Sequence, residues 1–397
     1  MGYNNINYVP SDRIAGFKPY FFVQLSQKIT ELKSMGVDII RLDMGSPDMP
    51  PEGKIIEKLR QEVLRPDVHA YSPSGGTQEF KEAVGTYYLN RYGVELDPVS
   101  EVFTLIGSKE GLFALSQVLL NPGDVSLVPD PGYPVYSASG RIAGAEILSI
   151  PLLETNNFLP DLDAIPQDKL RKAKIIWVNY PNNPTGATAT EVFYKKLINF
   201  AHQNNLLIAH DAPYADVTFD GYRAMSILQF DGAQEVTVEF NSLSKMYNMA
   251  GWRLGMAVGN AQVIKFLGTY KSQQDSSHFT PIMSAGMCAL TSDQNWIKDR
   301  NLIYQERRDI IVSSLINAGI EVNNPKAAIY IWVKLPENEK SSINFCTRLL
   351  EETGVSTTPG SVFGLFGEGY LRISLCTSTS RISEAMERFT QWSRKLG

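Results

Sequence analysis

Lys245 stands in a stretch whose side chains could bind an amine-reactive ligand that carries a phosphate. Ser242 and Ser244 precede it, and Arg253 follows it. A lysine attacks a carbonyl only as the neutral amine, which requires burial or nearby positive charge. Hydroxyls and a planar guanidinium are suited to phosphate. The stretch therefore predicts a nucleophilic lysine beside a phosphate group, whereas a lysine without such neighbours is by default a solvated surface residue.

Three polar segments with candidate site residues each follow a short apolar run. Asn183, Asp211 and Lys245 all belong to such segments. Short apolar runs bounded by turn residues are typical of buried strands, and ligands bind at the carboxyl ends of strands in α/β sheets. We therefore expect these side chains to gather at one edge of a sheet. The apolar runs cover residues 175–178, 206–209 and 236–240.

The order of these motifs resembles that of a known family. Asn-Pro-Thr-Gly at 183–186, Asp-x-x-Tyr at 211–214 and Ser-x-Ser-Lys at 242–245 are followed by an arginine at 253. Each motif is weak alone, but their order and strand context make coincidence a poor explanation. The chain resembles the fold-type I, pyridoxal-phosphate-dependent aminotransferases of class I and II over essentially its whole length. This implies an α/β fold, with a mostly parallel central sheet in a large domain and a smaller α+β domain.

The resemblance implies roles for the residues around the cofactor ring. Lys245 would hold pyridoxal 5′-phosphate as a Schiff base and then move a proton between substrate and cofactor. Asp211 would pair with the pyridinium nitrogen and keep it protonated, which makes the ring an electron sink. Tyr214 and Asn183 would hydrogen-bond the 3-oxygen of the ring. A turn residue and a core aromatic are the alternatives for Asp211 and Tyr214, and the family spacing ahead of Lys245 disfavours both.

The cofactor phosphate would lie where an expected strand, 102–106, turns into a helix with periodic leucines. Glycine at 107 and the free N–H groups of a helix N-terminus are suited to anions. By resemblance, the backbone amides of Ser108 and Lys109 bind the phosphate. The remaining phosphate contacts would come from Ser242, Ser244 and Arg253.

Two tyrosines complete the expected cofactor site. Tyr133 follows an expected strand at 125–128 and would stack on the pyridine ring. Tyr71 lies in a glycine-rich loop and matches the tyrosine that reaches the cofactor phosphate of a neighbouring subunit. The resemblance therefore implies a homodimer with shared active sites. A tyrosine packed within its own loop is the alternative.

Arg372 is the expected ligand of the substrate α-carboxylate. The segment 370–375 alternates like a half-buried strand, with Arg372 on the face opposite its leucines and isoleucine. A guanidinium binds a carboxylate through two parallel hydrogen bonds, whereas lysine is a poor replacement. By resemblance, Asn183 and the backbone at Gly45 lie beside the same carboxylate. A structural arginine paired with an acidic neighbour is the alternative.

Substrate choice rests on fewer residues. Lys109 matches a lysine that in some related enzymes binds the distal carboxylate of a dicarboxylic substrate, so we expect glutamate and 2-oxoglutarate as one pair. A solvated lysine in the first helical turn is an equal alternative. The segment 271–280 has no arginine, which disfavours one branch of aspartate aminotransferases. Tyr20, Phe21 and Phe22 on the N-terminal arm would line the side-chain pocket or pack against the small domain.

Longer stretches resemble bacterial LL-diaminopimelate aminotransferases most, and alanine aminotransferases almost as closely. These stretches are residues 41–48, 106–112 and 238–245. The expected activity is transfer of an amino group from an amino acid to a 2-oxo acid, ping-pong through pyridoxamine phosphate, in lysine or other amino-acid biosynthesis. The alternatives are an alanine or aspartate aminotransferase, a pyridoxal-phosphate-dependent β-lyase, and a non-catalytic binding or regulatory module.

Composition agrees with this interpretation. The 37 basic and 42 acidic side chains give a net charge of −5, which disfavours nucleic acid as a partner. Three cysteines without paired spacing and four histidines predict a reducing compartment and no metal site. No apolar run approaches the roughly 20 residues that span a bilayer, and the first residues do not read as a signal peptide. We therefore expect a cytoplasmic protein that does not bind membranes.

We expect three parts along the 397 residues. Residues 1–45 would form an arm and part of the small domain, with an amphipathic helix ended by Gly36. Residues 46–290 would form the large cofactor-binding domain, because short apolar strands alternate there with helical segments. Residues 291–397 would form the small C-terminal domain, which begins with a long helix near 296–318.

Overall fold

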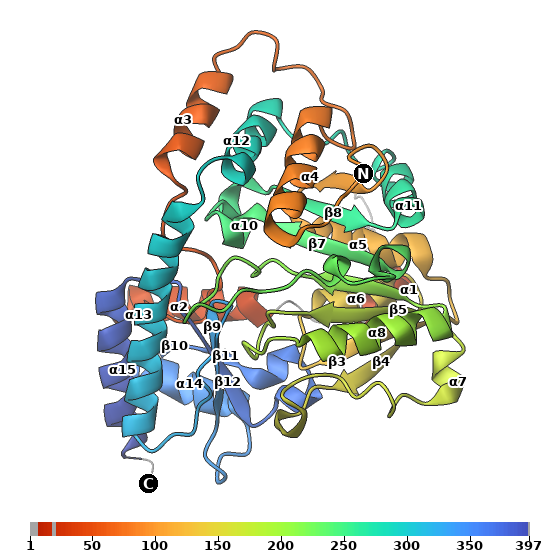
Figure 1. Ribbon diagram of the computed structural model, residues 1–397. Coiled ribbons are helices and arrows are strands. Elements are labelled where there is room, and N and C mark those ends of the chain that lie inside the picture. The colour runs from red at the N-terminus through yellow and green to blue at the C-terminus, as the bar shows by residue number, and fades with distance from the viewer. Residues whose placement is uncertain (1–6, 18–20, 396–397) are drawn as a thin grey trace, which may run out of the picture.

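A computed structural model describes residues 7–17 and 21–395 of the chain. Its centre is a seven-stranded sheet with the strand order β2-β8-β7-β6-β5-β3-β4 (Figure 1). Strands β4, β3, β5, β6 and β7 are parallel to one another, whereas β8 is antiparallel to both β7 and β2. The expected mostly parallel sheet is therefore present. Its strands are β2 Val102–Leu105, β3 Val125–Asp130, β4 Glu146–Pro151, β5 Ala173–Asn179, β6 Leu207–Asp211, β7 Thr237–Ser242 and β8 Gly255–Gly259.

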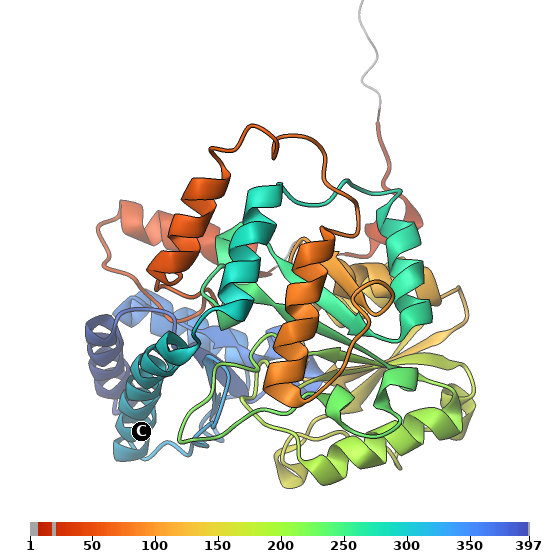
Figure 2. The ribbon, with the colours of Figure 1, turned by 45° about the horizontal axis from the view of Figure 1, so that its top comes forward.

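The central strands are mostly apolar because helices cover both faces of the sheet. In β5, Ile176 and Val178 pack into one hydrophobic cluster with helices α4, α8 and α12. Ile175 and Trp177 point the other way and pack with α5, α6 and α11. Figure 2 shows α3, α12 and α4 side by side on the outside of the sheet. The helices of this part are α3 Gly53–Glu62, α4 Gln78–Tyr92, α5 Ser108–Leu119, α6 Val135–Ile142, α7 Gln167–Leu170, α8 Glu191–Asn204, α9 Ala233–Val236, α10 Leu243–Met246, α11 Ala261–Lys271 and α12 Thr280–Thr291.

A second, smaller sheet has the order β11-β12-β9 and is antiparallel. Helices α13 and α15 pack against each other beside it (Figure 1). Leu371 and Ile373 of β12, and Leu375 directly after it, are fully buried in the core that these elements share, as the alternation in the sequence predicts. The elements of this part are β9 Tyr330–Lys334, β11 Thr358–Pro359, β12 Tyr370–Ser374, α13 Asn295–Asn317, α14 Ser342–Thr353 and α15 Thr379–Ser393.

The N-terminal region joins the C-terminal part of the fold. Strand β1, Ile40–Arg41, pairs in parallel with β10, Val355–Ser356. The expected amphipathic helix is α2, Phe21–Ser34, and Gly36 beyond its end has a φ of +85°. The left-handed conformation at that position favours glycine. The short helices are α1 Asp12–Ala15 and the 3₁₀ turns η1 Glu154–Asn156, η2 Ile227–Gln229, η3 Ala250–Trp252, η4 Gly360–Phe363 and η5 Leu365–Gly367.

Within the described residues, no helix is both long and apolar enough to cross a membrane.

Candidate active site

A cavity of about 360 Å³ lies at the carboxyl ends of β5, β6 and β7. This volume lies within the range of small-molecule sites. The predicted site residues that line it come from both the central sheet and the smaller one. They are Gly45, Ser108, Lys109, Tyr133, Asn183, Asp211, Tyr214, Ser242, Ser244, Lys245, Arg253 and Arg372.

Three residues that the sequence offered for the site, Tyr20, Phe21 and Tyr71, are not among those that line the cavity. Tyr71 is 93% exposed and lies on the loop before α4. Tyr20 lies outside the described residues, so its expected contact with the side-chain pocket stays a prediction. Its neighbour Phe22, at the start of α2, does line the cavity.

Lys245 lies in α10, directly after β7, and its amine donates a hydrogen bond to the backbone oxygen of Gly45. Burial lowers the pKa of Lys245 to about 8, and the guanidinium groups of Arg372 and Arg253 contribute in the same direction. A lowered pKa raises the fraction of neutral amine near neutral pH. The amine of Lys245 therefore has the burial and the nearby positive charge that a nucleophilic lysine requires.

Asp211 is held at one carboxylate oxygen only. Its Oδ2 accepts a hydrogen bond of 2.6 Å from the hydroxyl of Tyr136. Its Oδ1 is buried and has no hydrogen-bond partner among the residues that the structure describes. Burial raises the pKa of Asp211 to about 6. A buried carboxylate oxygen without a donor is costly, so this atom is suited to a cationic N–H group of a ligand.

The N-terminus of α5 and Arg253 form a positive end of the cavity. Gly107 precedes the helix with a φ of +73°, and a Cβ at that position would collide with the guanidinium of Arg253. Arg253 also donates to the hydroxyl of Ser244 at 3.4 Å. Burial and the nearby Arg253 lower the pKa of Lys109. Helix N–H groups and a guanidinium together are suited to a phosphate.

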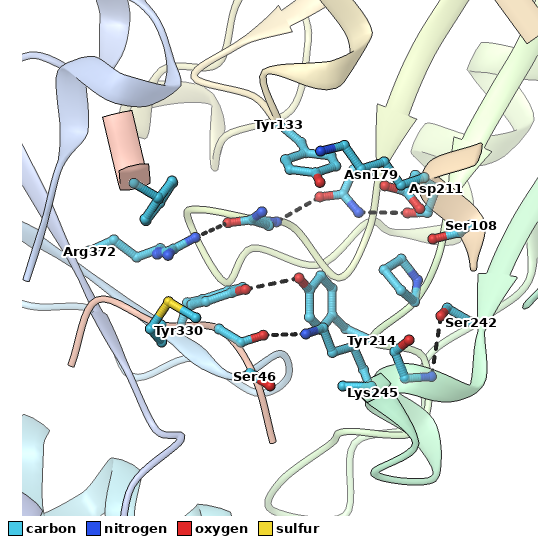
Figure 3. Close-up of a pocket in the computed structure, with 18 of the residues that line it drawn as sticks. Ser46, Ser108, Tyr133, Asn179, Asp211, Tyr214, Ser242, Lys245, Tyr330 and Arg372 are labelled. Atoms are coloured by element: carbon cyan, nitrogen blue, oxygen red, sulfur yellow. Dashed lines mark hydrogen bonds between the residues drawn. The ribbon is translucent and has the colours of Figure 1, made fainter. Parts of the chain in front are cut away.

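Arg372 lies at the other end, which Figure 3 shows opposite Asp211 and Ser108. It donates hydrogen bonds of 2.8 Å to the side-chain oxygen of Asn183 and to the backbone oxygen of Asp43. In the described part of the chain it forms no ion pair, and its buried Nε has no hydrogen-bond partner. A buried guanidinium without an acid requires an anion, so this end is suited to a carboxylate.

The sequence comparison decides the family of this site. The sequence pattern of class I and II aminotransferases matches residues 37–389. This chain belongs to the class I and II aminotransferases.

Relatives cover nearly the whole length of this aminotransferase. It is 48% identical over 378 residues to the LL-diaminopimelate aminotransferase of Halothermothrix orenii, and the match covers 95% of this chain and 97% of the relative. The apo-BacF structure from Bacillus subtilis has a TM-score of 0.95 at 36% identity and covers 99% of this chain. The aspartate aminotransferase of Thermus thermophilus with maleate has a TM-score of 0.90 at 29% identity and covers 97%. The last two matches cover all of the compared chains.

Several residues of the cavity were not predicted from the sequence. Tyr330, at the start of β9, forms a hydrogen bond of 3.1 Å between its hydroxyl and that of Tyr214. Which side chain of β9 faces Arg372 depends on the register between β9 and β12, which the sequence does not show. The other lining residues that were not predicted are Met44, Ser46, Asn179, Pro213, Ala250 and Phe363.

His210 precedes Asp211 but points away from the cavity. Its Nδ1 lies 2.8 Å from Oε2 of the buried Glu239, on the other side of the strand. Adjacent strand residues face opposite sides of a sheet, which explains the difference. Among residues 7–17 and 21–395, no group of three or more metal-binding side chains is present.

Proposed function

We propose that this aminotransferase is an LL-diaminopimelate aminotransferase that uses pyridoxal 5′-phosphate, with glutamate and 2-oxoglutarate as one amino pair. The observation that carries the proposal is the position of Lys245 between an arginine without an acidic partner and an unpaired carboxylate oxygen. The amino acid substrate is supported by the relatives of about 48% identity that bear this name.

The residues of the cavity fit the cofactor. Oδ1 of Asp211 is the buried acceptor that a protonated pyridine nitrogen requires. The α5 N-terminus with Ser108 and Lys109, together with Ser242, Ser244 and Arg253, would hold the phosphate. Tyr133 would stack on the ring, and Tyr214 and Asn183 would bind its 3-oxygen. When bound, the cofactor supplies an aldehyde that condenses with amines and a ring that accepts electrons from the substrate Cα.

The remaining chemistry belongs to the side chains. Arg372 would hold the substrate α-carboxylate beside Asn183, and so place the substrate Cα toward the amine of Lys245. Lys245 would then remove the proton from that carbon as a base, and as an acid deliver it to the cofactor carbon two bonds away, on the other side of the nitrogen. A pKa of about 8 suits both roles near neutral pH. Lys109 would contact a second carboxylate on the substrate.

Tyr71 supports a homodimer with shared sites as part of the proposal. Its ring is 93% exposed, and the nearby Leu64 is 74% exposed. Large exposed apolar side chains on one loop are typical of a protein interface. The same proposal keeps the expected division into residues 1–45, 46–290 and 291–397. Three free cysteines support the cytoplasm as location.

A substrate assay tests the proposal. The loaded enzyme is incubated with 2-oxoglutarate and one of LL-diaminopimelate, alanine or aspartate, and glutamate is measured. The proposal predicts glutamate from LL-diaminopimelate at a kcat/KM at least about tenfold above the other two donors, a margin in the range that pocket contacts provide. A preference for alanine would establish the alanine enzyme. Release of ammonia without a 2-oxo acid would establish a β-lyase.

A further inference from the structure

Tyr330 lines the cavity and contacts both Arg372 and Tyr214. Its hydroxyl forms a hydrogen bond of 3.1 Å with the hydroxyl of Tyr214 (Figure 3). A Cβ on Gly45 would collide with the hydroxyl of Tyr330, so this hydroxyl lies close to the backbone of Gly45. Gly45 in turn accepts the hydrogen bond of the Lys245 amine. The phenol of Tyr330 thus touches Gly45, which binds the amine of Lys245, and Tyr214, which lines the same cavity.

The ring of Tyr330 also contacts the guanidinium of Arg372. The central carbon of the guanidinium lies 4.0 Å from the ring centroid, nearer than it lies to Phe363, at 4.8 Å. The register of the small sheet causes this contact. Arg372 in β12 pairs with Trp332 of β9, and Tyr330 lies two residues before Trp332 and so points to the same face. A cation on an aromatic face is attracted most strongly where water is absent.

We propose that Tyr330 is a positioning residue that couples carboxylate binding at Arg372 to the protonation of the Lys245 nitrogen. This inference rests on the proposed function, because it assigns Arg372 to the substrate carboxylate and Tyr214 to the cofactor. The path has three contacts: Arg372 to the ring, the hydroxyl of Tyr330 to that of Tyr214, and the same hydroxyl to the backbone at Gly45. The side chain acts through Tyr214 and Gly45.

The coupling follows from electrostatics. While Arg372 is unpaired, its charge favours the neutral form of the lysine. A bound carboxylate neutralises that charge and weakens the attraction between the guanidinium and the ring. The hydroxyl pair of Tyr330 and Tyr214 is buried, so a change at one end is transmitted through a low dielectric. A packing role alone would not require the hydroxyl.

The experiment uses three variants of the full-length enzyme loaded with pyridoxal phosphate. Tyr330→Phe removes the hydroxyl and keeps the ring on Arg372. Tyr330→Leu removes both. Tyr370→Phe is the matched control, because Tyr370 lies on the adjacent strand and its hydroxyl donates to Glu154 at 3.4 Å, away from the residues that line the cavity.

The visible absorption of each protein is titrated with pH, without and with saturating glutarate, an unreactive dicarboxylate. In the wild type and in Tyr370→Phe, glutarate should raise the midpoint of the titration. In Tyr330→Phe the shift should fall by at least half, while the dissociation constant of glutarate stays within about threefold, since the ring remains. Tyr330→Leu should lose the shift and should also raise the dissociation constant of glutarate about tenfold.

A full shift in Tyr330→Phe would overturn the proposal, as would an equal loss in Tyr370→Phe or a wild type whose midpoint does not respond to glutarate. A wild type that takes up no cofactor would instead overturn the proposed function on which the inference rests. The two failures are therefore distinguishable.

Discussion

The hydroxyl of Tyr136 donates to Oδ2 of Asp211 at 2.6 Å, and Oδ1 of the same carboxylate stays buried without a partner in the described part of the chain. Tyr136 is itself fixed by stacking on Trp177, at 5.0 Å between ring centroids. One oxygen is therefore held by the protein, and the other is free to accept a hydrogen bond from a ligand. The unpaired oxygen lowers the stability of the protein without a ligand, but it leaves an acceptor for a cationic N–H group.

Replacing Asp211 with Asn should have opposite effects on stability and activity. Burial raises the pKa of Asp211 to about 6, from an ordinary 3.8, so the folded protein binds more protons than the unfolded chain between these values. Its stability therefore falls as pH rises through that window. At pH 7 the cofactor-free Asp211→Asn protein should be more stable than the wild type by about 1–3 kcal/mol, and at pH 4 nearly equal to it.

Thermal unfolding of both cofactor-free proteins at the two pH values measures this difference. With cofactor bound, the same variant should lose about 100-fold or more in kcat, because an amide does not hold the ring nitrogen protonated. A variant that is less stable than the wild type at pH 7 would show that Asp211 is structural.

Lys245→Ala should abolish transamination and keep part of the cofactor binding, because the phosphate and ring contacts remain. The expected loss is at least about 10³-fold in kcat. Lys54→Ala is the matched control, since its side chain is 67% exposed. Steady-state assays and cofactor titration give both values. Activity close to that of the wild type in Lys245→Ala would place the reactive amine elsewhere.

Reconstitution of the cofactor-free protein should report the pKa of Lys245. Only the neutral amine reacts, and a pKa of about 8 leaves roughly one-tenth of it neutral at pH 7. The rate of reaction with pyridoxal phosphate should rise about tenfold from pH 6 to 7 and level off above pH 8. Stopped-flow absorbance measures the rate. A rise that continues to pH 10 would mean that burial does not lower this pKa.

Arg372→Lys should lower kcat/KM for all amino acid substrates together, because the α-carboxylate is common to them. The charge is kept, but the planar fork and its contacts with Asn183 and Asp43 are lost. We expect kcat/KM to fall about 100-fold for glutamate and for LL-diaminopimelate. Arg348→Lys, at a partly exposed ion pair, is the control. If only one substrate is affected, Arg372 binds a side chain instead.

Mixing two inactive variants tests the shared site. In a heterodimer of Lys245→Ala and Tyr71→Ala subunits, one site would combine an intact Lys245 with an intact Tyr71. After mixing and exchange of subunits, activity should rise above that of either variant, toward a quarter of the wild-type value for random pairing. Mixtures that stay at the level of the separate variants would place Tyr71 in its own subunit's structure only.

Much of the site was predictable because its residues follow strands in order. Asn183, Asp211 and Lys245 are reached from β5, β6 and β7, which are neighbours in the sheet. Buried parallel strands are recognised by apolar runs, and their carboxyl ends share one edge. The orientation of His210, opposite to that of Asp211, agrees with the two-residue period of a strand.

Tyr330 was not predictable in the same way. Its role depends on the pairing of β9 with β12, whose residues are about 40 positions apart in the sequence, and on the closeness of Gly45, far toward the N-terminus. Neither distance follows from local pattern. Nothing in the type of Tyr330 separates it from Trp332 or Tyr370 on the same face of the sheet, which do not line the cavity.

The most direct test of the central claim is the visible absorption spectrum of the purified protein with pyridoxal phosphate, recorded before and after addition of glutamate, alanine or LL-diaminopimelate without any 2-oxo acid. We predict that the band of the lysine-bound cofactor is lost and that an amine-type band at shorter wavelength appears with glutamate and LL-diaminopimelate. A band that none of the three amino acids changes, or no band at all, would contradict an aminotransferase site built on Lys245.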